Sequence, residues 1–366
     1  MKLMTILPGA AVCLLLACAC NNKNANSGPM SVLPSGWGEP AEQNDTIPAT
    51  EPKDTATAPV RPTVTPPAGW TDVSANYGEV PDYVCIFRSP ETLQDRKAVA
   101  FIAYVDASKQ SFSVWGIRDV GTQGTTDSYQ TPSQVYDSKG KPSVVINGGY
   151  FFTESGKNYA ASLAVNAGEL LSTNINYASK DWVDIYAPTR AVFLEHADSN
   201  YEAAWSYYSS KSSHWVYQVP AANSYANKPL QTPSSTFPSK GAKFEAVNGI
   251  GGGPVLLKGG EIKNTYIEEM FDEGGINPTS PNNPRTAIGV TADRHLILFA
   301  CEGREQTAGV VGFTTAELAR ILKDCGCTDA INLDGGGSTI MLVNGKELFK
   351  PSDGKQRSVG SCVYVK

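Results

Sequence analysis

One short segment combines a carboxylate, three consecutive glycines and a hydroxyl, which together could bind and cleave an anionic ligand. Asp334 is followed by Gly335, Gly336, Gly337 and Ser338. Glycines allow positive φ and a close approach of ligand to backbone, and successive N–H groups in such a turn can form an anion site. The same residues could also form only a tight turn whose amides bind Asp334. Other parts of the chain must decide between these two interpretations.

Several other polar residues stand at the ends of apolar runs, where a strand would deliver them to a cleft. Asn147 ends the run SVVIN and precedes Gly148, and Asn248 opens the glycine-rich segment NGIGGGPV. Both amides could bind sugar hydroxyls. Arg285 and Thr286 begin another apolar run, and an arginine there can hold a phosphate or carboxylate through two parallel hydrogen bonds.

Two further residues complete the candidate set. Glu302 follows the run LILFAC and could serve as a second carboxylate, although a surface ion pair with Arg304 would explain it equally well. Arg357 is a second candidate for binding phosphate. The histidines lack zinc-site spacing and there is no Gly-x-Ser-x-Gly motif. We therefore expect no cofactor and no metal site, since a divalent cation near Asp334 has no ligand pattern to support it.

Strands dominate the secondary structure that must position these residues. The expected strands cover residues 97–105, 111–117, 143–147, 287–290, 295–301, 329–333 and 361–365, with hairpins in 161–172, 254–262 and 340–349. Thr314 and Glu317 predict a capping box for one helix, which Gly326 would end. Residues 173–245, rich in Tyr and Trp, are expected to form an irregular insertion packed by aromatics, or alternatively a platform for sugar rings. The predicted fold class is α+β, with mixed, mostly antiparallel sheets and a few helices.

The N-terminal part of the chain has the features of an export signal. Residues 1–17 contain an apolar stretch, 6–16, that is too short to span a bilayer as a mature helix. It ends in the sequence LLAC, typical of bacterial lipoproteins, so we expect lipidation at Cys18. Cys20 is the weaker candidate, and an ordinary signal peptide with incidental cysteines is the alternative. Residues 18–69 have the composition of a disordered tether, and residues 70–366 are expected to form one domain. The predicted location is the bacterial cell envelope, periplasmic or surface-facing, with the membrane reached through the lipid anchor.

Five segments of the predicted domain share their order with a known family. The segments are VINGGYF, NGIGGGPVL, NPRTAIGV, INLDGGGST and the closing RSV, spread between residues 145 and 365. Together they resemble the phosphodiester glycosidase family. The resemblance implies a single hydrolase domain that releases a sugar from a phosphodiester-linked or related anionic glycan. The identity of the substrate does not follow from a shared fold.

The implied chemistry assigns a role to each candidate residue. A departing phosphate is a weak base, so it needs less help from a general acid than an ordinary glycosidic oxygen does. Arg285, Arg357, the glycine N–H groups and Ser338 would hold the phosphate. Asp334 or Glu302 would attack the anomeric carbon or activate water. Asn147 and Asn248 would orient sugar hydroxyls, and Gly148 and Thr286 would also contact the substrate.

Two other functions remain compatible with the same residues. One is a non-catalytic lipoprotein that binds anionic polysaccharide, and the other is a phosphodiesterase that cuts the P–O bond. The formal net charge of −6 and the absence of a dense basic segment argue against nucleic acid as a partner.

Overall fold

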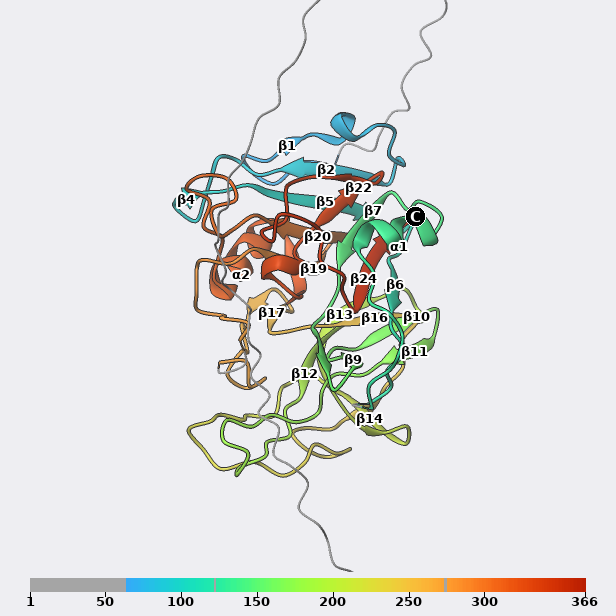
Figure 1. Cartoon of the computed structure of the whole chain (residues 1–366), viewed down its shortest axis with the longest axis vertical. Helices are drawn as coiled ribbons and strands as arrows, with labels where there is room; N and C mark the ends of the chain where they lie inside the picture. Colours follow the sequence, from blue (N-terminus) through green and yellow to red (C-terminus); the bar gives the residue numbers. More distant parts are fainter. Residues whose placement is uncertain (1–63, 122, 273–274) are drawn as a thin grey trace, which may run out of the picture. The chain divides into compact units, whose positions relative to one another are not determined.

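Three antiparallel sheets form the framework of the computed structural model (Figure 1). The structure describes residues 64–121, 123–272 and 275–366, so the predicted signal peptide, Cys18 and most of the tether lie outside the described residues. In the described part of the chain, no helix is both long and apolar enough to cross a membrane.

The largest sheet has eight strands and supplies most of the strand ends that matter for the site. In spatial order these are β1 (Thr71–Asp72), β2 (Val84–Arg88), β5 (Ala100–Asp106), β20 (His295–Cys301), β19 (Arg285–Thr291), β21 (Cys327–Asn332), β17 (Val255–Lys258) and β18 (Glu261–Ile262). Strand β19 pairs antiparallel with both β20 and β21. Because β20 and β21 therefore run in the same direction, their C-terminal ends meet at the edge where β19 begins.

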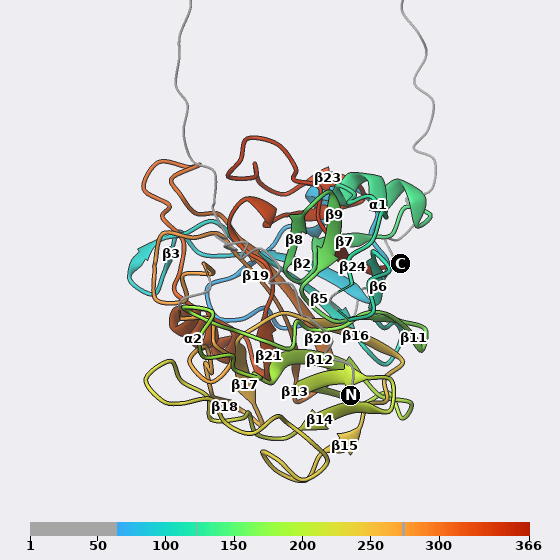
Figure 2. The ribbon, with the colours of Figure 1, turned by 60° about the horizontal axis from the view of Figure 1, so that its bottom comes forward.

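A seven-stranded sheet and a five-stranded sheet pack against the first. The seven-stranded sheet contains β11 (Glu169–Ser172), β10 (Ala164–Asn166), β16 (Asn248–Gly251), β12 (Arg190–Glu195), β13 (Tyr201–Ser210), β14 (Ser213–Tyr217) and β15 (Ala242–Lys243). The five-stranded sheet contains β23 (Lys346–Glu347), β22 (Met341–Val343), β7 (Val144–Asn147), β24 (Ser361–Val365) and β6 (Ser113–Gly116). The view of Figure 2 shows how these sheets approach one another.

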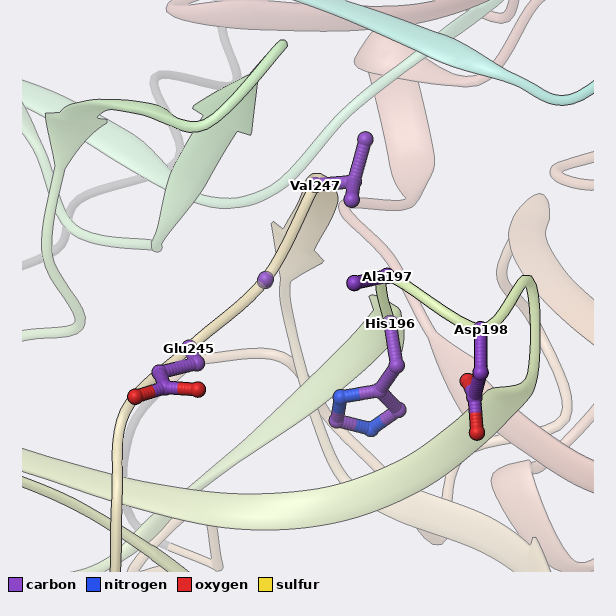
Figure 3. Close-up of a pocket in the computed structure, with 6 residues that line it drawn as sticks. His196, Ala197, Asp198, Glu245 and Val247 are labelled. Carbon is purple, nitrogen blue, oxygen red and sulfur yellow. The ribbon is translucent and has the colours of Figure 1, made fainter.

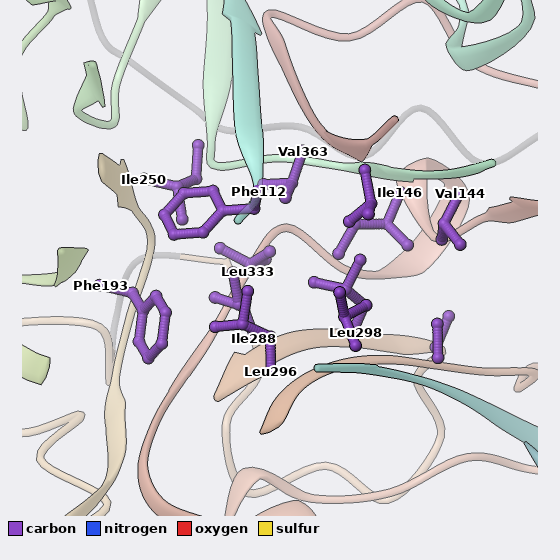
Figure 4. Close-up of a cluster of buried hydrophobic side chains, with 14 of the residues drawn as sticks. Phe112, Val144, Ile146, Phe193, Ile250, Ile288, Leu296, Leu298, Leu333 and Val363 are labelled. Carbon is purple, nitrogen blue, oxygen red and sulfur yellow. The ribbon is translucent and has the colours of Figure 1, made fainter. Parts of the chain in front are cut away.

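The main hydrophobic core lies where the three sheets meet. It takes Ile288 and Leu298 from the eight-stranded sheet, Phe193 from the seven-stranded sheet and Ile146 from the five-stranded sheet, together with Phe112, which precedes β6 (Figure 4). All five side chains are at most 1% exposed. Burial of this apolar surface holds the three sheets together, and the strand ends that carry the polar candidates emerge at its margin.

Two helices cover outer faces of the sheets. Helix α2 (Thr315–Asp324) has the predicted capping box between Thr314 and Glu317, and it packs on the eight-stranded sheet through residues that include Leu318 and Leu322. Helix α1 (Pro132–Ser138) lies on the five-stranded sheet. Two hairpins, β3 (Thr92–Leu93) with β4 (Arg96–Lys97) and β8 (Phe151–Glu154) with β9 (Lys157–Ala160), complete the set. The predicted fold class is confirmed.

The prediction of an irregular insertion over residues 173–245 is wrong in its centre. Strands β12, β13 and β14 form a regular antiparallel meander there. Consecutive residues Ala203, Ala204 and Trp205 are all buried, because this part of β13 is covered on both faces. A strand buried on both faces loses the alternation of polar and apolar residues by which strands are usually found.

Candidate functional site

The backbone of Asp334 is fixed from two sides by strand β7 and the residue after it. The Asp334 N–H donates to the carbonyl of Gly148 at 3.0 Å, and its carbonyl accepts from Nδ2 of Asn147 at 2.7 Å. Asn147 Oδ1 accepts from the Thr286 hydroxyl at 2.7 Å and from the Ile340 N–H at 3.2 Å. One buried amide thus ties β7, β19 and both ends of the glycine loop to a single geometry.

This arrangement changes the roles predicted for Asn147, Gly148 and Thr286. Asn147 and Thr286 are both 0% exposed, and their polar side-chain atoms bind protein partners. They therefore do not face a substrate. We assign all three residues to the positioning of Asp334 instead of to sugar binding.

The glycine loop brings two arginines to the carboxylate. Gly336 has φ +58°, and a methyl group there would come within 2.7 Å of Nη2 of Arg304. A side chain on Gly337 would collide with Arg357 and with its ion-pair partner Asp353. Glycines permit this close approach, so they admit two guanidinium groups next to the loop. The N–H groups of Gly335 and Gly336 donate to Asp334 Oδ1 and to the Pro284 carbonyl. The phosphate-binding role predicted for these two N–H groups is therefore wrong.

The environment of Asp334 changes its acidity. Burial raises the pKa of the carboxyl to about 6, against the opposing effects of a hydrogen bond from Ser338, the charge of Arg357, the Gly335 N–H and the charge of Arg304. The Gly335 N–H donates to Oδ1 at 2.9 Å. Asp334 is partly exposed, so it is accessible to a ligand and titrates close to neutral pH.

Glu302 and Asp334 occupy equivalent places on either side of the start of β19. Glu302 follows β20 and Asp334 follows β21 after one intervening residue, and β19 lies between these strands. Side chains on Gly303 and Gly335, the next residues in each case, would both meet Pro284. Glu302 is 7% exposed, and its Oε2 has no partner among the described residues.

Arg285 does not occupy the phosphate-binding role predicted for it. Its side chain is 1% exposed, and its guanidinium donates to the carbonyls of Phe313, Ile276, Asn277 and Ser280 at 2.7–3.3 Å. A guanidinium that binds four backbone carbonyls has little capacity left for a ligand. Arg285 instead holds the loop of residues 276–280 against the start of β19.

Asn248 is also displaced from the site, because it lies at the opposite end of β16. Its amide donates to Glu195 Oε2 at 2.6 Å and accepts from the Ala167 N–H. It is next to a surface pocket of about 470 Å³ lined by His196, Ala197, Asp198, Glu245, Ala246 and Val247 (Figure 3). None of the residues predicted to carry chemistry lines this pocket.

The glycine-rich end of that segment lies against Asn332, two residues before Asp334, and involves residues that the prediction missed. The Tyr150 hydroxyl donates to the Gly253 carbonyl at 2.6 Å and accepts from Nδ2 of Asn332 at 2.9 Å. Burial and the nearby Asp334 carboxyl raise the pKa of Tyr150, so its hydroxyl keeps its proton. Both residues stand inside the quoted segments VINGGYF and INLDGGGST, which is the signal that could have identified them.

A second buried carboxyl, Glu269, lies behind Gly253. It accepts hydrogen bonds from the Val255 and Ala191 N–H groups and from the Thr265 hydroxyl at 2.7–2.8 Å. Burial raises its pKa to about 7. In the described ranges there is no group of three or more His, Cys, Asp or Glu side chains that could hold a metal ion.

Comparison with known proteins places this geometry in a family. The family model of phosphodiester glycosidase matches residues 140–366, more than half of the chain. Human N-acetylglucosamine-1-phosphodiester alpha-N-acetylglucosaminidase is 37% identical over 103 residues, which are 28% of this chain and 19% of that protein. The SPbeta prophage-derived uncharacterized protein YomE of Bacillus subtilis (strain 168) is 36% identical over 127 residues, 35% of this chain and 18% of that protein.

Solved structures show the same fold. The catalytic domain of zebrafish N-acetylglucosamine-1-phosphodiester alpha-N-acetylglucosaminidase, auto-inhibited by its pro-peptide, has a TM-score of 0.50 and 23% identity, covering 76% of this chain and 81% of that one. A hypothetical protein from Synechocystis has a TM-score of 0.50 and 17% identity, covering 78% and 62%. The chain spans less than a fifth of the length of the two relatives compared above by sequence. By the extent of the family match, the chain belongs to the phosphodiester glycosidase family.

Proposed function

We propose that the domain hydrolyses a glycosyl phosphodiester, or a related anionic glycan, between the anomeric carbon and the phosphate oxygen. One observation carries the proposal: the partly exposed carboxylate of Asp334 begins a glycine loop, and the side chains of Arg304 and Arg357 lie against that loop. A carboxylate beside two cations suits a ligand that has an electrophilic carbon and a negative charge within a few bonds of each other.

The phosphate would lie against Arg304, Arg357 and the Ser338 hydroxyl. Nη1 of Arg357 lies 3.4 Å from Ser338 Oγ, and the Arg357 side chain is 39% exposed, so its charge can be shared with a ligand. Charge-assisted hydrogen bonds of this kind stabilise a departing phosphate dianion as the C–O bond breaks. Arg357 thus keeps the phosphate-binding role predicted for it, and Arg304 takes the role predicted for Arg285.

Asp334 would supply the reacting carboxylate. Either it attacks the anomeric carbon, or it accepts the proton of a water molecule that does so; in both cases the electrons of the breaking C–O bond leave with the phosphate. In the first case, water then attacks the anomeric carbon, breaks its bond to Asp334 and regenerates the carboxylate. Asp334 is preferred over Glu302 because it adjoins both arginines, whereas Oε2 of Glu302 is enclosed without a partner among the described residues.

We further propose that lipidated Cys18 holds the domain at the bacterial cell envelope. The LLAC sequence and the composition of residues 18–69 support this proposal.

Replacing Asp334 by Asn should lower kcat on a glycosyl methyl phosphodiester by about 10²–10⁴-fold, while ligand binding is largely retained. In the wild type, kcat should fall about tenfold per pH unit below pH 6, since only the ionised carboxylate reacts. Initial rates across pH 4–8 test both points, with Asp137→Asn on the exposed face of α1 as control. An unchanged kcat in Asp334→Asn would rule out Asp334 as the reacting group.

Arg304→Met and Arg357→Met should each raise KM for the phosphodiester about ten- to hundredfold, because each removes a charge-assisted bond to phosphate. Arg357→Met should also move the acid limb of the kcat profile to higher pH, since the Arg357 charge lowers the pKa of Asp334. The surface variant Arg118→Met, which loses an exposed pair with Glu169, should behave as wild type. KM values that do not respond to either variant would argue against a phosphate site at this loop.

Cys18→Ser should transfer the full-length protein from the membrane to the soluble fraction of its bacterial host. Cys20→Ser, two residues away, serves as the matched control and should leave the protein with the membrane. Fractionation and immunoblotting give the answer. Release of the protein by Cys20→Ser but not by Cys18→Ser would show that Cys20 carries the lipid and would contradict the assignment to Cys18.

A further inference from the structure

Arg190, the first residue of β12, is a buried cation that makes no ion pair or guanidinium hydrogen bond with any described residue. Its side chain is 7% exposed, and its Nε has no hydrogen-bond partner. A buried charge is normally paired or fully hydrogen-bonded, because its removal from water is costly. The buried guanidinium therefore has donors positioned to bind an anion.

Aromatic rings surround the guanidinium. Its Cζ lies 4.2 Å from the centre of the Phe271 ring. Burial lowers the pKa of the guanidinium, and Tyr225 and Tyr150 are near enough to oppose that effect. Phe271 and Tyr150 are themselves neighbours, with ring centres 5.4 Å apart. Cation–π contact holds the planar group in place without using its N–H donors.

Glu269 does not neutralise Arg190 by direct contact. Its oxygens accept from two backbone N–H groups, the Thr265 hydroxyl and the Trp205 indole, and its charge acts on Arg190 only over a longer distance. The donors of Arg190 therefore remain available for an external acceptor.

A continuous set of contacts joins Arg190 to the Asp334 loop. Phe271 closes over Gly253, where any side chain would collide with the ring. The Gly253 carbonyl accepts from Tyr150 and Asn332, and Asn332 precedes Asp334 by two residues. Tyr150 and Phe271 thus lie between Arg190 and the Asp334 loop, whereas Arg304 and Arg357 adjoin the glycine loop directly.

From this geometry we propose that Arg190 forms a second anion subsite, which recognises a carboxylate on the sugar of the substrate. The inference rests on the proposed function: with phosphate at Arg304 and Arg357 and the anomeric carbon at Asp334, the sugar extends towards Tyr150 and Phe271. The substrate class is then a phosphodiester of an acidic sugar such as a uronic acid. The rings of Tyr150 and Phe271 would contact the sugar, and Arg190 would bind its carboxylate through two parallel hydrogen bonds.

The test compares glucuronic acid 1-(methyl phosphate) with glucose 1-(methyl phosphate), which differ only at the carboxylate. Binding to the full-length Asp334→Asn protein is measured by calorimetry, so turnover is not required. The acidic sugar should bind about ten- to hundredfold more tightly. Adding Arg190→Met should remove this preference, adding Arg190→Lys should retain part of it, and adding Arg118→Met should leave it intact.

The outcomes separate this inference from the proposed function. Equal affinity of the two diesters for Asp334→Asn overturns the subsite, even if Arg190→Met fails to fold. An acidic-sugar preference that survives Arg190→Met assigns it to another residue and also overturns it. If the preference depends on Arg190 but the wild type hydrolyses neither diester, the subsite stands and the proposed reaction fails.

Discussion

The two hydrogen bonds that Asn147 and Gly148 make to the backbone of Asp334 determine the geometry of the whole site. They hold the N–H and the carbonyl of one residue, so the direction in which its carboxylate leaves the chain is fixed by the end of β7. Thr286 extends this control to β19. The Asp334 loop, although rich in glycine, is therefore anchored to strand ends of two sheets and can accept a ligand without first becoming ordered.

Burial and positive charge act on Asp334 in opposite directions. Burial alone favours the neutral acid, whereas Arg357, Arg304 and the Ser338 and Gly335 donors favour the carboxylate. The resulting pKa of about 6 means that the folded protein keeps this proton between roughly pH 4 and 6, where an unfolded aspartate has lost it. The stability that this group contributes is thus lost as pH rises through 6, in the range where the carboxyl group becomes ionised.

The sequence indicated where the candidate site is located, but only partly which of its atoms are free to meet a ligand. Asp334 and the glycines stand out because a polar residue at the end of an apolar run is exposed by the strand it follows. The same reasoning failed for Arg285 and Asn248, since residue type does not reveal whether a donor meets a ligand or another group of the protein. Arg190 was missed because its strand lies in a stretch that is buried on both faces and so shows no alternation. Its unpaired state depends on the packing of Phe271, which comes from a distant part of the chain.

The central claim is that the bond broken is the one between the anomeric carbon and oxygen, with the phosphate as leaving group. Hydrolysis of a glycosyl methyl phosphodiester in H₂¹⁸O, followed by mass spectrometry of both products, tests it most directly. Cleavage at carbon places the ¹⁸O label in the released sugar and leaves the methyl phosphate unlabelled. Label in the methyl phosphate would show attack at phosphorus and would contradict the assignment of Asp334 and the two arginines to glycosidic cleavage.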